Sequence, residues 1–173
     1  MLFNIADISK ETAFLNVDEN ALRRMADAVE TAIREHTHNN FQNRLIRFEA
    51  AAENNVIKGT HPFLRVGDTV EISESANKGL YVVKEIADGQ IKVNKELYPV
   101  AHNLITKVEY PADVIAGALE LMKWRAKFGG KIGVKSETIS RHSVTYYDNT
   151  ATSTGGYPAA LMGFLTPYMK ARF

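Results

Sequence analysis

The hydrophobic residues of this 173-residue chain change their spacing twice, and this change limits the possible folds most strongly. Between residues 18 and 36 the apolar side chains recur every three or four positions, which predicts an amphipathic helix. The same spacing returns between residues 114 and 126. In residues 41–108 the apolar side chains instead alternate with polar ones, as in half-buried strands. The sequence therefore predicts an α+β protein with helices at both ends and strands in the middle.

The N-terminal helix has a clear start and one apolar face. Asp18 is a good N-cap, because its carboxylate can accept hydrogen bonds from the amides of the first turn. The helix is expected to end at the polar run of residues 37–40. The apolar stripe consists of Leu22, Met25, Ala26, Val29, Ala32 and Ile33. The opposite face carries Arg23, Arg24, Asp27, Glu30 and Arg34.

The middle segment reads as a series of short strands joined by tight turns. Residues 69–72, 80–86 and 90–93 are predicted strands, and another is expected around residues 45–48. Asp88-Gly89 lies between two apolar runs and indicates a type I′ hairpin, which needs two positive φ values. So many strands at such close spacing favour a small antiparallel barrel or sandwich.

The C-terminal part begins with a second helix, and Pro111 suits its first position. Gly129-Gly130 is expected to end it. Residues 131–147 read as extended, and a last helix begins at Pro158 and is interrupted by Pro167. The second helix has the stripe Val114, Ile115, Ala118, Leu119, Met122 and Ala126; the last helix has Leu161, Phe164, Leu165 and Tyr168. The predicted organisation is a helical bundle of residues 1–40 and 109–173, with an inserted barrel-like β domain of residues 41–108.

The composition excludes several functions. The chain has 21 basic and 20 acidic side chains and no cysteine. Near neutrality disfavours bulk electrostatic binding of nucleic acid or anionic membranes, and the lack of cysteine excludes disulfides and thiolate metal sites. The charge is uneven, since residues 1–111 hold 13 basic and 16 acidic side chains and residues 112–173 hold 8 and 4. No apolar run is long enough to span a bilayer, and no secretory signal is visible.

The motif search predicts no enzyme, metal or cofactor. His36 and His38 form the closest histidine pair, but at a helix end they point apart and have no third ligand nearby. Glu137 and His142 lie near serines on one extended segment, which cannot form a catalytic triad. The glycines lack phosphate-loop spacing. The single tryptophan, Trp124, is out of step with its helix's apolar stripe, so it fits either an interface or the core.

The C-terminal third resembles a known family. Residues 110–114 open a helix, residues 134–146 contain a Ser-Glu-x-Ile-x-x-x-Ser-Val-x-Tyr segment, and Gly156-Tyr157-Pro158 precedes a final helix ending in basic residues. This order is similar to the head–tail connector proteins of long-tailed bacteriophages, and residues 5–40 resemble the family's opening helix. The family has a short connection where this chain has residues 41–108.

The resemblance implies a structural protein with no catalytic residues. It would form a ring, commonly of twelve subunits, below the portal of the virion, after synthesis in the cytoplasm of the host bacterium. Its partners would be the portal protein, a stopper or tail-completion protein and its own copies, and DNA would pass through the channel without sequence-specific binding. The candidate interface residues are Trp124, Lys135, Glu137, Arg141, Tyr146, Tyr157, Tyr168 and Arg172.

Three alternatives remain open from the sequence. The first is a tail-completion or stopper protein at the same joint. The second is a small nucleic-acid-binding regulator that uses the basic residues between 123 and 141, because phosphate contacts need such side chains. The third is a small hydrolase that uses Glu137 and His142.

Overall fold

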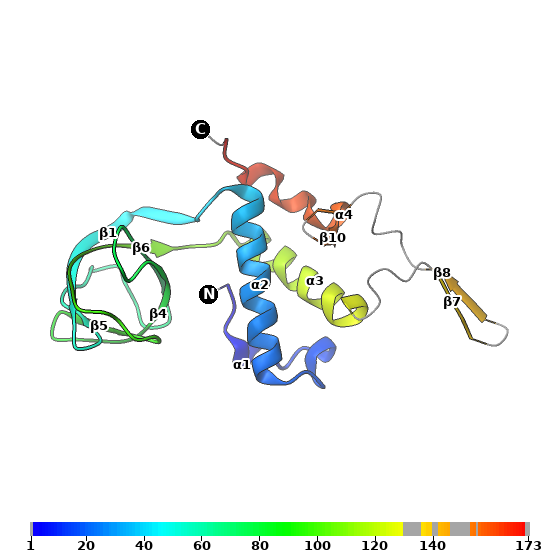
Figure 1. The fold of residues 1–173 in the computed structure, drawn as a ribbon, viewed down its shortest axis with the longest axis horizontal. Helices are drawn as coiled ribbons and strands as arrows, with labels where there is room; N and C mark the ends of the chain where they lie inside the picture. Colours follow the sequence, from blue (N-terminus) through cyan, green and yellow to red (C-terminus); the bar gives the residue numbers. More distant parts are fainter. Residues whose placement is uncertain (1, 130–135, 140–141, 146–152, 155, 172–173) are drawn as a thin grey trace. The chain divides into compact units, whose positions relative to one another are not determined.

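The computed structural model describes residues 2–129, 136–139, 142–145, 153–154 and 156–171. It combines helices with antiparallel sheet, so the predicted α+β class is confirmed. The chain divides into two compact units, which are the barrel unit (residues 40–110) and the helical unit (residues 2–39 and 111–173) (Figure 1).

The barrel unit is a closed antiparallel barrel with the strand order β1-β2-β5-β4-β3-β6. The sequence left a barrel and a sandwich open, and the structure is a barrel. The sequence pattern did not single out β6. The strand bounds are β1 Gln42–Glu53, β2 Val56–Ile57, β3 Thr69–Ser73, β4 Gly79–Ala87, β5 Gln90–Val93 and β6 Val100–Val108.

The predicted hairpin between β4 and β5 is confirmed. Ala87 pairs with Gln90 across the turn, and Asp88 and Gly89 both have positive φ, of 51° and 71°. A type I′ turn requires this conformation, which glycine adopts without strain and aspartate tolerates. The inward residues of the strands then meet in one core. Its fully buried members include Val70, Ile72, Val83, Ile91 and Ile105.

The outer edge of β1 is covered although β2 contains only two residues. Val56 and Ile57 pair with β1, and the Lys58 amide then donates to the Ala51 carbonyl at 2.8 Å. Three residues further on, the His61 ring lies 6.4 Å from that of Phe48. The chain from residue 56 to residue 61 therefore runs antiparallel beside β1. It shields backbone groups that would otherwise invite another strand.

The helical unit contains two long helices and several short elements. The long helices are α2 Glu19–Thr37 and α3 Ala112–Phe128. The short helices are α1 Ile5–Ile8, η1 Thr12–Phe14, α4 Ala159–Met162 and η3 Gly163–Tyr168. The strands are β7 Ser136–Ile139, β8 His142–Thr145, β9 Ser153–Thr154 and β10 Tyr157–Pro158.

Helix α2 begins as predicted, because Asp18 Oδ2 accepts a hydrogen bond from the Ala21 amide at 3.1 Å. The assignment of Glu30 to the polar face is wrong, since this residue is only 4% exposed. The N-terminal segment folds back onto α2, and the Leu2 amide donates to Glu30 Oε2 at 3.3 Å. A long-range contact thus buries a position that the local pattern assigns to solvent.

Helix α3 buries a slightly different stripe from the predicted one. Ile115 and Ala126 are exposed, whereas Leu121, outside the predicted stripe, is fully buried beside Met122. Pro111 occupies the N-cap position, one residue before the predicted place. Gly129 is the C-cap, and Gly130 lies outside the described residues. The buried face is rotated because α3 packs against α2, η1 and the C-terminal turns.

The C-terminal segment is helical only in short stretches, and its α-helix ends at Met162, before Pro167, where the interruption was expected. The α-helical part lasts four residues and gives way to the 3₁₀ helix η3 at Gly163. Pro167 lies inside η3. Of the predicted stripe, Leu165 is fully buried.

Candidate assembly surfaces

Trp124 and Tyr157, two of the predicted interface residues, lie side by side. Their ring centroids are 5.8 Å apart, and the Phe128 ring lies 5.9 Å from that of Trp124. Trp124 is half-buried, whereas Tyr157 is 2% exposed and accepts a hydrogen bond from Arg125 Nη1 at 3.2 Å. Tyr157 thus serves the packing of the helical unit, and Trp124 presents part of its ring to solvent.

Tyr168 fastens the end of the described chain to both long helices. Its hydroxyl donates to the Asp113 carboxylate at 2.8 Å, and its carbonyl accepts from Asn39 Nδ2 at 3.2 Å. Two residues later, the Lys170 amide donates to the Thr37 carbonyl at 2.8 Å. The hydrogen bond to Asp113 raises the pKa of Tyr168, because the carboxylate stabilises the protonated phenol. The hydroxyl of Tyr168 therefore already has a partner within the unit.

The remaining predicted interface residues belong to the region after α3. Glu137 lies in β7, where its backbone is opposite Val144 of β8. Lys135, Arg141, Tyr146 and Arg172 lie outside the described residues. Among the described strands, β7 pairs only with β8, and the two form a sheet of their own.

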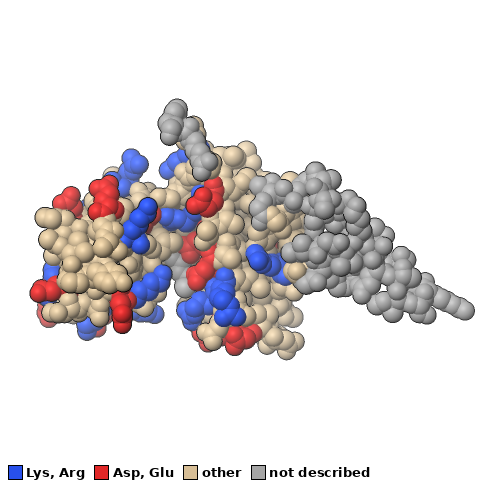
Figure 2. Space-filling view, viewed as in Figure 1, with Lys and Arg blue, Asp and Glu red and all other residues tan. Residues whose placement is uncertain are grey.

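The charge asymmetry belongs to the helical unit. The barrel unit holds nine basic and nine acidic side chains, whereas residues 2–39 of the helical unit hold four basic and seven acidic ones. Both signs are interspersed over the described part of the face in Figure 2. Part of the asymmetry is neutralised inside the unit, since Lys123 of α3 pairs with Glu11 beside η1 at 3.4 Å.

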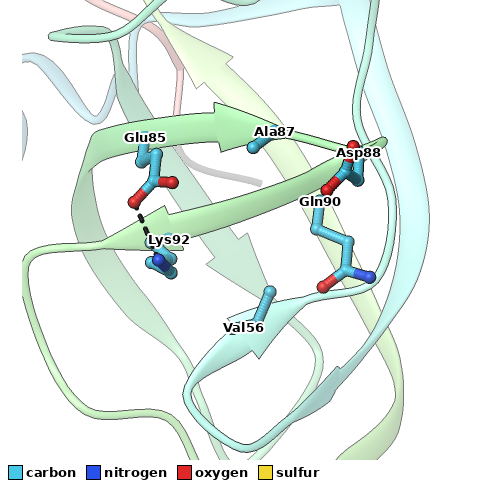
Figure 3. A pocket seen from close by; sticks show the side chains of 6 residues that line it. All are labelled: Val56, Glu85, Ala87, Asp88, Gln90 and Lys92. Atoms are coloured by element: carbon cyan, nitrogen blue, oxygen red, sulfur yellow. Dashed lines mark hydrogen bonds and ion pairs between the residues drawn. The ribbon is translucent and has the colours of Figure 1, made fainter.

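The barrel carries an open hollow of about 220 Å³ (Figure 3). Glu85 of β4 and Lys92 of β5 form an ion pair of 2.8 Å at its rim. The rest of the lining consists of Val56, Ala87, Asp88 and Gln90. Glu85 and Lys92 thus neutralise each other, and Asp88 is the remaining charged residue of the lining.

No metal-binding group was found in the described residues, where no cluster of three or more histidines and acids is close enough to hold an ion. His36 lies inside α2, and His38 is its C-cap in the left-handed conformation, with φ of 49°. No helix in the same part of the chain is long and apolar enough to cross a membrane.

A set of exposed apolar side chains on the barrel was missed by sequence reasoning. Leu45 was read as part of a strand, but it is 88% exposed because residues 44–46 bulge out of β1. Phe63 and Val66 are 66% and 61% exposed on the loop before β3. On the helical unit, Leu15 is 65% exposed. The local signals for turns at these places are Asn43 two residues before Leu45, Pro62 directly before Phe63 and Gly67 directly after Val66.

The chain matches no known protein-family model, and no curated protein matches it.

Proposed function

We propose that this protein is a head–tail connector of a long-tailed bacteriophage, which forms a ring under the portal and extends the DNA channel toward the tail. The proposal includes a helical bundle as the ring-forming part, with the barrel as an insertion. Its partners are the portal protein, a stopper or tail-completion protein and further copies of the same chain. The protein has no catalytic role, and its place is the head–tail interface of the virion.

The observation that carries the proposal is the β7–β8 hairpin between α3 and the C-terminal turns. It lies within the residues on which the resemblance to the connector family depends. A two-stranded hairpin is only marginally stable by itself in water. Contacts with neighbouring subunits would stabilise such an element, so its presence supports a protein that functions in an assembly.

Two further observations support a role carried by surfaces. In the hollow on the barrel, Glu85 and Lys92 are held in an ion pair with each other. The charge asymmetry lies within the helical unit, and a ring with head-to-tail contacts needs two complementary surfaces on each subunit. A nearly neutral chain also suits a channel through which DNA must slide, because a strongly basic lining would hold the phosphates.

The proposal is tested by mixing the protein with the portal protein encoded in the same genome. Light scattering and negative-stain electron microscopy should show a ring attached to one end of the portal. A matched variant that lacks residues 136–145 should bind less well, while circular dichroism shows that its helices remain. If the full chain does not bind the portal over a wide range of concentration and salt, the proposal is wrong.

A further inference from the structure

We draw no further inference here: the strongest candidate, the surface patch of exposed apolar side chains, Phe63 and Val66, on the loop before β3 of the barrel, carries none because nothing in the structure shows what covers it.

Discussion

The ring of Phe164 lies where a side chain on Gly117 would have to stand. A β-carbon built on Gly117 would be 2.5 Å from two carbons of that ring, far inside van der Waals contact. Gly117 belongs to α3 and Phe164 to η3, so glycine at this position lets the C-terminal turns approach the helix closely. The relationship leads directly to a prediction about stability.

Gly117→Ala should destabilise the protein. Alanine favours a helix over glycine by about 1 kcal/mol, but inserting a methyl group into a tight contact costs about 1–3 kcal/mol. We expect the free energy of unfolding to fall by about 1 kcal/mol, which urea denaturation measures. Gly163→Ala is the matched control, because its β-carbon would meet nothing within 4 Å and its φ is −58°. That variant should be neutral or slightly more stable, and the opposite ranking of the two variants would contradict the packing argument.

Lys107→Met should destabilise the barrel in a pH-dependent way. Lys107 Nζ lies between Asp68 and Glu109, and its side chain is 14% exposed. Burial alone would lower the pKa of Lys107, but hydrogen bonds to Glu109 and Asp68 outweigh it and raise that pKa. Hydrogen bonds from Lys107 and then Asn43 lower the pKa of Glu109 below 4.5. Because the folded state favours ionised Glu109, this stabilisation is present above pH 4.5 and is lost as the pH falls through the lowered pKa.

The loss of this half-buried pair should cost about 1–2 kcal/mol at neutral pH, between the values for exposed and buried pairs. Thermal unfolding from neutral pH down to pH 3 gives the comparison. The wild type should lose more stability than Lys107→Met as Glu109 becomes protonated. Lys92→Met removes a more exposed pair with Glu85 and should cost under about 0.5 kcal/mol. Parallel pH curves for wild type and Lys107→Met would show that the network does not stabilise the barrel.

Asn103→Ala should be among the most damaging single changes in the barrel. Asn103 is 1% exposed, and its Nδ2 donates to the Ala50 carbonyl at 3.1 Å and the Val100 carbonyl at 3.2 Å. Its Oδ1 accepts from Ser75 and Asn77. Truncation leaves several of these buried groups without partners, at a cost of about 2–3 kcal/mol. Asn94→Ala is the control, since Asn94 Oδ1 accepts from Val82 at an exposed site and should cost less than half as much. Equal urea midpoints for the two variants would contradict this assignment.

The elements whose signals are local could be predicted from the sequence. Asp88-Gly89 specifies its hairpin, and Asp18 specifies the start of α2, because each acts through its own backbone neighbours. The predictions that were wrong concern residues whose burial depends on distant parts of the chain. Glu30 is buried because the segment around Leu2 folds over it, and the stripe of α3 is rotated by its packing partners. Strand β6 was not singled out because Asn103, a polar residue, lies at one of its buried positions.

The candidate surface residues show the same difference between local signals, which the sequence carries, and packing against distant residues, which it does not. The exposure of part of Trp124 was one of the two possibilities inferred from its position relative to the apolar stripe of α3. The burial of Tyr157 was not visible in the sequence, since it depends on packing against Trp124 across more than thirty residues of chain. The exposure of Leu45 was missed because the bulge at this residue looks like continuous strand in the sequence. Only the pairing with β6 shows where the register shifts.

His38→Gly should stabilise the protein. His38 ends α2 in the left-handed conformation, with φ of 49°, and its amide donates to the Arg34 carbonyl. The Asn39 amide donates to the same carbonyl at 3.3 Å. Glycine adopts this conformation without the steric cost of a β-carbon, so the gain should be about 0.5–1 kcal/mol.

The matched control is His36→Gly, two residues earlier and inside the helix, where glycine should cost about 1 kcal/mol. Thermal and urea unfolding of both variants measure the two effects in the same helix turn. We expect the two variants to move the urea midpoint in opposite directions. If both variants lower it, the imidazole of His38 makes a stabilising contact that outweighs the backbone strain.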